Sequence, residues 1–202
     1  IEIVACNLYP FSDAAATKPP LDDPTLLEMV DIGGPTMVRA SAKNHRNVVI
    51  ACNPIDYESI VSELKSGTVS LERRRELALK AYEHTAAYDS AIANELASRW
   101  VGLPEDSDDK DEQAKRLPKT MTAAAHRMQT LRYGENSHQA AALYVDPGAN
   151  DGETLVTAHV EGGKEMSYNN YSDADATLRL CRALSTDEWP KTPHACVIVK
   201  HN

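Results

Sequence analysis

Two short apolar runs stand out near the start of the chain, Ile1–Cys6 and Asn47–Cys52. Both contain several β-branched residues, and each leads into a turn-forming segment, Asn-Leu-Tyr-Pro-Phe after the first and Asn53-Pro54 after the second. Short apolar runs bounded by turn signals are typical of buried strands. We therefore expect two strands here.

The segment between these runs has the pattern of two helices. Asp23-Pro24 is a helix-start signal, the glycine pair at 33–34 is expected to end that helix, and Pro35 is expected to begin a second one that runs through Ala42. Proline fits the first turn of a helix, whereas glycine commonly follows the last turn.

Two more helices are predicted after the second strand. Asn53 is a candidate N-cap with Pro54 at the first helical position, and Ser70 is a candidate N-cap for a longer helix. Apolar residues recur on one face of each helix. They are Tyr57, Ile60, Val61 and Leu64 in the first, and Leu77, Ala81, Tyr88, Ile92 and Leu96 in the second. The order of strand, helices, strand, helix, helix predicts an α/β layered domain.

Residues 102–120 interrupt this pattern with prolines and dense charge, so we predict an acidic linker or insertion between two domains, 1–101 and 121–202. Shorter alternating runs follow the linker. We expect strands around Arg127–Tyr133, Ala142–Val145, Leu155–Val160 and Glu165–Tyr168, a helix over Ser172–Leu184, and a last strand over Ala195–Lys200.

Composition narrows the classes of function. The 202 residues are 42% hydrophobic and 25% charged, as in globular proteins, and the net charge of −9 argues against a nonspecific binder of nucleic acid or of anionic membranes. No apolar run is long enough to span a bilayer, so a cytoplasmic location is expected. The four cysteines form no CxxC pair, which favours buried thiols over a zinc site or a disulfide framework.

The two ends of the chain both fall in predicted strands, since Ile1 begins one and Asn202 follows another directly. Domains rarely end inside a sheet, because the exposed edge leaves backbone groups unpaired. We therefore expect the chain to be an internal piece of a longer protein.

Several uncommon strings occur along the chain in one fixed order. They are NLYPF at 7–11, DIGGPTMVRASAKNH at 31–45, KAYEHTAAYDSAI at 80–92, LRYGENSHQ at 131–139, GKEMSYNN at 163–170 and VKHN at 199–202. Together they resemble the bacterial form of the bifunctional purine-biosynthesis family, in which an AICAR formyltransferase is fused to an IMP cyclohydrolase. The resemblance covers nearly the whole chain, except the acidic segment and residues 185–194.

The resemblance implies an α/β fold: part of a methylglyoxal-synthase-like domain, followed by the start of a cytidine-deaminase-like transferase domain. It implies transfer of a formyl group from the cosubstrate 10-formyltetrahydrofolate to AICAR, and closure of formyl-AICAR to IMP with loss of water. It further implies a homodimer and no metal requirement.

Residue by residue, the resemblance assigns catalytic roles in the cyclohydrolase to Tyr9, Asp31 and Lys43. In the transferase it assigns them to Lys200 and His201. The substrate-binding residues that it implies are Asn7, Gly33, Gly34, Arg132, Tyr133 and Asn169. The family's glycine-rich phosphate loop would lie before Ile1 and its KHxNPCG continuation after Asn202, so we expect the chain alone to be inactive.

The chemistry of these residue types is compatible with the assignment, although each has a simpler interpretation. Around one carbonyl, an Asp can supply an anchor, a Tyr a proton shuttle and a Lys a positive partner. The simpler interpretation of Asp31 is a polar residue at a helix end. That of Lys43 is a solvated cation in the last turn of a helix. His84 and Tyr88 are expected to stabilise packing. Arg132 offers a planar fork to an anion or carboxamide, or an ion pair to Glu135.

Two other functions remain open from the residues. The chain could be a noncatalytic dimerisation or nucleotide-binding module, which genuine ends at residues 1 and 202 would favour. A methylglyoxal-synthase-like phosphate lyase would share the first domain's fold, but it would leave the segment from LRYGENSHQ to VKHN unexplained.

Overall fold

The computed structural model describes residues 1–101, 119–146, 154–159, 161–184 and 195–200. The chain divides into two compact units, residues 1–124 and 125–202. The predicted acidic linker lies almost wholly outside the described residues, so its character and the predicted domain bounds stay predictions. The mixed α/β class is confirmed, whereas the two subdomain folds implied by the resemblance stay predictions.

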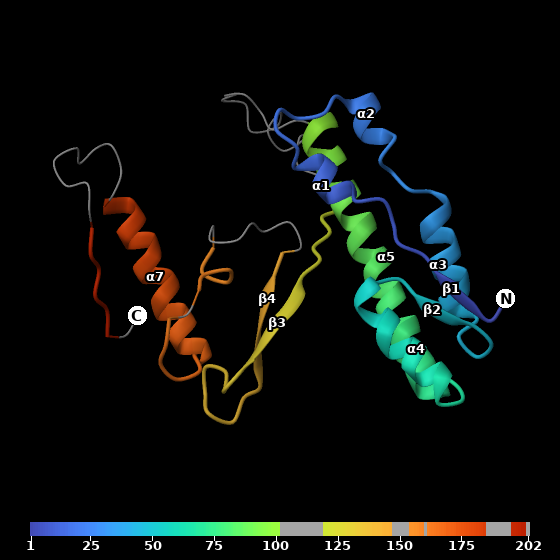
Figure 1. The fold of residues 1–202 in the computed structure, drawn as a ribbon. Helices are drawn as coiled ribbons and strands as arrows, with labels where there is room; N and C mark the ends of the chain where they lie inside the picture. The colour runs from blue at the N-terminus through green and yellow to red at the C-terminus, as the bar shows by residue number, and fades with distance from the viewer. Residues whose placement is uncertain (102–118, 147–153, 160, 185–194, 201–202) are drawn as a thin grey trace. The chain divides into compact units, whose positions relative to one another are not determined.

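The first unit is built on a small parallel sheet. Strand β1 (Ile3–Ala5) pairs in parallel with β2 (Val49–Ala51), in the register Ile3 to Val49 and Ala5 to Ala51 (Figure 1). Both strands lie inside the predicted apolar runs. The expectation of a buried strand holds for β2 and is wrong for β1, in which Ile3 and Ala5 are exposed. A parallel pair needs a crossover between its strands, and helices provide it here.

Six helical segments complete the described part of this unit. They are α1 (Phe11–Ala15), α2 (Asp23–Leu27), α3 (Gly33–Lys43), the 3-10 turn η1 (Pro54–Asp56), α4 (Tyr57–Lys65) and α5 (Leu71–Trp100). The predicted order of strands and helices is confirmed. The short α1 was not expected, because its sequence follows directly on the turn signals of NLYPF.

The starts of the helices follow the capping signals with small shifts. Ser70 caps α5 by accepting the backbone N–H of Arg73 at 3.1 Å. Asn53 caps η1, not α4, which begins three residues later than predicted. The prediction that the glycine pair at 33–34 ends a helix was wrong: α2 already ends at Leu27, and the glycines form the first turn of α3.

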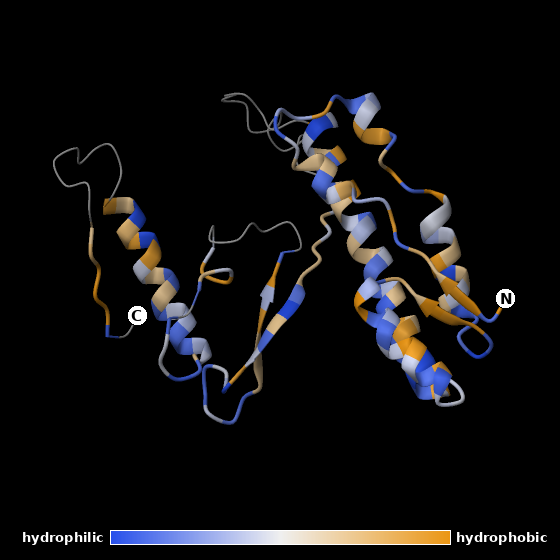
Figure 2. Ribbon diagram, viewed as in Figure 1, coloured by the Kyte–Doolittle hydropathy of each residue, from blue (hydrophilic) through white to orange (hydrophobic). Residues whose placement is uncertain are grey.

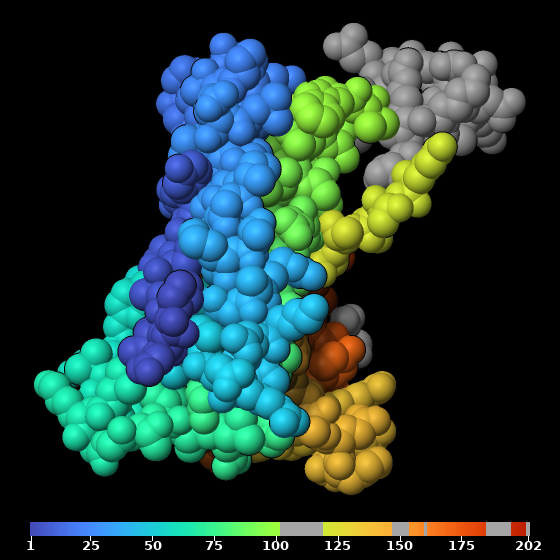
Figure 3. Space-filling model, turned by 90° about the vertical axis from the view of Figure 1, so that its right-hand side faces the viewer, coloured from blue at the N-terminus to red at the C-terminus, as the bar shows by residue number. Residues whose placement is uncertain are grey.

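The main core of the first unit lies where α3 and α5 meet the sheet. Its buried members are Val38, Ala42, Val49, Ile50, Ala51, Cys52, Ile60, Val69, Leu77, Ala78 and Ala81. Figure 2 shows the apolar sequence of the two strands against helices with mixed polarity, as amphipathic covering helices require. In the space-filling view α3 (light blue) lies directly against α5 (green) (Figure 3).

A second cluster lies further along α5. Phe11 and Leu26, from α1 and α2, are buried against the half-buried Tyr88 and Ile92 of α5. The 30-residue α5 thus supports both clusters, and it carries the segments that follow β1 on its second half.

The second unit contains one antiparallel hairpin and one helix among its described residues. Strand β3 (His126–Leu131) pairs with β4 (Ala141–Val145), with an irregularity between Arg127 and Gln129 (Figure 1). Helix α7 (Tyr168–Leu184) begins four residues before the predicted start at Ser172.

Three predicted strands of the second unit are absent from its described part. Residues 154–159 form turns, residues 161–167 are bends and irregular backbone, and residues 195–200 make no strand pairing. Periodicity alone could not distinguish an extended segment from a paired strand, because pairing requires a neighbouring strand to accept the backbone hydrogen bonds.

Candidate functional site

The segment that precedes α3 fixes the carboxylate of Asp31. Oδ1 of Asp31 accepts the backbone N–H of Gly34 at 2.7 Å, which satisfies one of the free N–H groups in the first turn of α3. The structure therefore contains the helix-terminal role that the simpler interpretation assigned to Asp31. Its side chain is half-buried and has a fixed direction.

Gly34 makes this arrangement possible. A Cβ atom at this position would lie 2.3 Å from Oδ2 of Asp31 and 2.8 Å from Cδ2 of Leu8. Leu8 belongs to the NLYPF segment, so two of the segments predicted to form a site meet at this glycine. Gly33 differs, because a Cβ there would meet nothing within 4 Å.

The hydroxyl of Tyr88 holds the other side of the same turn. It accepts the backbone N–H of Asp31 at 2.8 Å and donates to the carbonyl of Met29 at 3.3 Å. Burial, with a smaller effect from the negative charge of Asp31, raises the pKa of Tyr88, so the phenol stays protonated near neutral pH. The expectation that Tyr88 serves packing agrees with these contacts.

Cys6 lies beside Asp31 at the carboxyl end of β1. Burial first, and then the nearby Asp31 charge, raise the pKa of the Cys6 thiol. This thiol faces the carbonyl of Gly34 at 3.9 Å. A protonated thiol in this position packs against the start of α3 and is a weak nucleophile.

Asn7 is held by a residue that the sequence did not single out. Its Oδ1 accepts a hydrogen bond from the hydroxyl of Tyr57, the first residue of α4. The preceding residue, Asp56, is buried and accepts from Lys80 of α5 at 2.7 and 2.8 Å, which anchors this end of α4. With its carbonyl occupied, the amide of Asn7 keeps its NH₂ group for another partner.

The remaining two predicted cyclohydrolase residues are not drawn into this group. The ring of Tyr9 is 54% exposed, and Lys43 is an exposed residue in the last turn of α3. Asp31 and Lys43 lie at opposite ends of α3, whose eleven residues correspond to about 15 Å of rise. Asp31, Gly34 and Leu8 of the NLYPF segment therefore meet at the start of α3, and Lys43 is apart from them.

In the second unit, Arg132 and Tyr133 lie in the loop between β3 and β4. The guanidinium of Arg132 lies over the ring of Tyr133, 4.8 Å from its centroid, and also donates to the Tyr133 hydroxyl at 3.1 Å. Hydrogen bonding to Ser167, and then to Arg132, lowers the pKa of Tyr133. Among the described residues no ion pair joins Arg132 to Glu135, and the guanidinium contacts Tyr133 instead.

The start of α7 packs against this loop. Asn169 donates from its Nδ2 to the carbonyl of Glu135 at 3.1 Å, and the backbone N–H of Tyr168 donates to the carbonyl of Tyr133 at 3.3 Å. Ser167, which is only 1% exposed, donates its hydroxyl to Asn170 at 2.9 Å. The structure thus brings Arg132, Tyr133 and Asn169 together.

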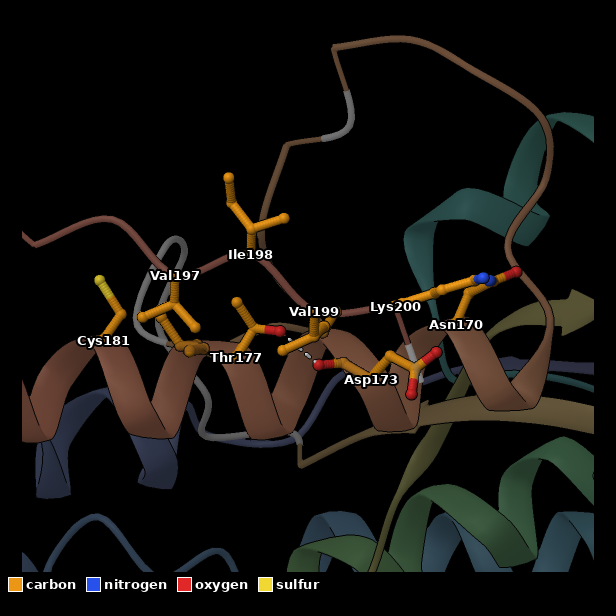
Figure 4. A pocket seen from close by; sticks show the side chains of 10 residues that line it. Asn170, Asp173, Thr177, Cys181, Val197, Ile198, Val199 and Lys200 are labelled. Atoms are coloured by element: carbon orange, nitrogen blue, oxygen red, sulfur yellow. Dashed lines mark hydrogen bonds between the residues drawn. The ribbon is translucent and has the colours of Figure 1, made fainter. Parts of the chain in front are cut away.

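Lys200 lines a pocket of about 640 Å³ between α7 and residues 197–200. Asn170, Asp173 and Thr177 contribute polar groups to it, and Figure 4 shows the side chain of Lys200 extended along α7 on the side of Asn170. Asn170 follows Asn169 directly, so this pocket adjoins the loop described above. His201 lies outside the described residues.

No group of three or more His, Cys, Asp or Glu side chains is placed to hold a metal ion within the ranges that the structure covers. In the same ranges, no helix has the length and apolar character needed to cross a bilayer.

Sequence reasoning missed Tyr57, Ser167 and Asn170. Tyr57 had been assigned to an apolar helix face, so its hydroxyl was not considered. Ser167 and Asn170 stand in the string SYNN, which was the available signal, but only Asn169 was taken from it.

The chain has an α/β fold, with polar groups after its first strand and around the LRYGENSHQ loop. A family model matches this chain. The chain belongs to the AICARFT/IMPCHase bienzyme family, whose model covers residues 41–202. The resemblance drawn from the motifs is thereby confirmed.

Two curated relatives carry the name bifunctional purine biosynthesis protein PurH. The protein from Persephonella marina is 46% identical and the one from Sorangium cellulosum is 41% identical, each over 100% of this chain. The chain spans 36% and 37% of the length of these relatives. A solved structure of a protein named ForH is 32% identical and covers 50% of this chain and 52% of its own, with a TM-score of 0.40, which is too low to bear on the fold.

Proposed function

We propose that this chain is the central part of a bifunctional purine-biosynthesis enzyme. Residues 1–101 form the end of its IMP cyclohydrolase domain and residues 121–202 the start of its AICAR formyltransferase domain. The intact protein acts in the cytoplasm as a homodimer. It uses 10-formyltetrahydrofolate as cosubstrate, passes through formyl-AICAR, and releases IMP without a metal.

One observation carries this proposal: the match to two proteins of that name extends over the whole chain at 41–46% identity. A phosphate lyase that shared only the first domain would not account for identity on both sides of the acidic segment. The match therefore favours the bifunctional enzyme over the lyase, and the length of the intact cellular protein decides between the enzyme and a noncatalytic module.

In the cyclisation, the carboxamide nitrogen of formyl-AICAR attacks the formyl carbon and forms the new ring bond. The carboxamide nitrogen loses one proton and the formamide nitrogen loses another, and the formyl oxygen leaves with these two protons as water. Tyr9 is the proposed proton shuttle and Asp31 the proposed anchor, and Asn7 presents its NH₂ to the substrate, with Tyr57 bonded to its carbonyl. Because α3 separates Asp31 from Lys43, we assign Lys43 to a different part of the substrate.

In the transfer, the amine of AICAR attacks the formyl carbon of the folate. The bond between that carbon and the folate nitrogen then breaks, and the proton lost by the amine ends on that nitrogen. Lys200 and His201 are the proposed pair for stabilising charge and moving this proton. Arg132, Tyr133 and Asn169 bind the substrate, an assignment supported by their contacts around the loop at 132–139.

Two variants of the intact protein test the assignment of the cyclohydrolase residues. Asp31→Asn and Lys43→Ala should strongly impair closure of preformed formyl-AICAR while formyl transfer continues at the parental rate, because the two reactions use separate domains. Lys65→Ala, an exposed lysine in the last turn of α4, is the matched control for Lys43. Near-normal cyclisation in both site variants would remove these residues from the site.

The 202-residue chain itself should show negligible formyl transfer, because positioning two substrates requires a nearly complete set of groups. Robust turnover by the purified chain of verified mass would contradict this expectation. Genuine ends at residues 1 and 202 in the cellular protein would favour the noncatalytic module instead.

A further inference from the structure

Tyr88 lies in the second half of α5 and contacts both segments that carry the proposed cyclohydrolase residues. Its hydroxyl bonds to two backbone groups of the turn before α3, the N–H of Asp31 at 2.8 Å and the carbonyl of Met29 at 3.3 Å. One hydroxyl thus satisfies a donor and an acceptor that are two residues apart.

The ring of Tyr88 contacts the other segment. Phe11, the last residue of NLYPF, packs edge-to-face on it, with ring centroids 6.4 Å apart and an interplanar angle of 74°. Phe11 is 1% exposed, so this contact is part of the core and fixes where the segment leaves β1. The loop that carries Asn7 and Tyr9 is therefore anchored on the same side chain as Asp31.

We propose that Tyr88 is a positioning residue of the cyclohydrolase site, which aims the carboxylate of Asp31 and fixes the NLYPF loop relative to it. This inference rests on the proposed function of that site. Tyr88 acts through Asp31 and Phe11, and the substrate does not need to touch it.

The physical basis is that, among the described residues, the Asp31 carboxylate accepts a single hydrogen bond. Its Oδ1 bond to the N–H of Gly34 sets a distance but allows the residue to rotate with the backbone of the turn. The hydroxyl of Tyr88 fixes that backbone. Without it, the N–H of Asp31 and the carbonyl of Met29 would seek water or new partners, and the turn would shift. Small displacements of a reacting group cost large factors in rate.

The test is Tyr88→Phe in the intact enzyme, which keeps the ring and its contact with Phe11 but removes the hydroxyl. We expect about a tenfold loss in kcat for cyclisation of formyl-AICAR, with a smaller change in KM and unchanged formyl transfer. Tyr82→Phe is the matched control, because Tyr82 lies on the same helix and contacts Arg39 instead of the site. Cyclisation by Tyr88→Phe within about twofold of the parental kcat would overturn the inference.

A double variant separates this inference from the proposed function. If Tyr88 acts through Asp31, Tyr88→Phe should cost little more in an Asp31→Asn background, whereas fully additive losses would overturn that route. An inert Asp31→Asn would overturn the proposed site itself and the role of Tyr88 with it. An essential Asp31 beside an inert Tyr88→Phe would overturn only the positioning role.

A measurement on the unmodified protein covers the case in which Tyr88→Phe does not fold. The backbone N–H of Asp31 should exchange slowly with solvent hydrogen, because it is bonded to a half-buried phenol. Exchange at the rate of an exposed loop would show that the hydroxyl does not hold the turn, and the inference would fall.

Discussion

Two adjacent glycines at the start of α3 should respond oppositely to the same change. Gly34→Ala places a Cβ 2.3 Å from Oδ2 of Asp31, 2.8 Å from its Cγ and 2.8 Å from Cδ2 of Leu8. All three separations are shorter than ordinary van der Waals contact, so Asp31 must rotate and Leu8 must move. Gly33→Ala meets nothing within 4 Å.

The magnitudes follow from these contacts. Overpacking costs about 1–3 kcal/mol, and losing the bond from the Gly34 N–H to Asp31 costs about 1 kcal/mol more. Alanine returns about 0.5–1 kcal/mol through its better helix propensity. The net expectation for Gly34→Ala is a loss of about 1–3 kcal/mol, and Gly33→Ala should be neutral or stabilising by up to about 1 kcal/mol.

Urea and thermal unfolding of the 202-residue chain, followed by circular dichroism, measure the difference between the two variants. A loss of this size corresponds to a Tm decrease of several degrees, roughly 3–5 °C for each kcal/mol in a unit of this length. Equal midpoints for Gly33→Ala and Gly34→Ala would refute the close approach of Asp31 and Leu8 to Gly34. In the intact enzyme, Gly34→Ala should also slow cyclisation.

Three further outcomes are expected. In the intact enzyme, His201→Ala should lower the rate of formyl transfer by about two to four orders of magnitude while cyclisation continues. Stopped-flow absorbance of the folate measures this rate. Transfer at the parental rate would contradict the catalytic assignment of His201. Asp31→Asn should lower the raised pKa of Cys6, because a nearby negative charge disfavours the thiolate. Alkylation of Cys6 at fixed pH should therefore become faster, which peptide mass spectrometry measures. An unchanged alkylation rate would show that the Asp31 charge does not act on Cys6. Arg132→Gln should raise the pKa of Tyr133, so that its phenolate appears only at higher pH. An absorbance titration, with Tyr133→Phe as the reference, measures this. An unchanged titration would contradict the contact between Arg132 and Tyr133.

Local sequence signals determined most elements of the first unit, although not the short α1 or the ends of α2 and α3. Ser70 capped a long helix as predicted, because an N-cap interaction involves residues only three apart in the chain. The two β-branched runs became paired strands, and the burial of β2 against α3 and α5 removes its apolar side chains from water. The motif strings alone led to the family, since uncommon residues in a fixed order carry information that does not depend on folding.

Contacts between distant residues were decided by tertiary structure. The hydroxyl of Tyr88 reaches the backbone of Asp31 across 57 positions of sequence, and the hydroxyl of Tyr57 reaches Asn7 across 50. No periodicity encodes such pairs, because they depend on how α4 and α5 pack on the sheet. The same limit explains why residues 195–200 form no strand although the pattern predicts one: their sequence favours extended backbone, but only a neighbouring strand can turn extended backbone into a sheet.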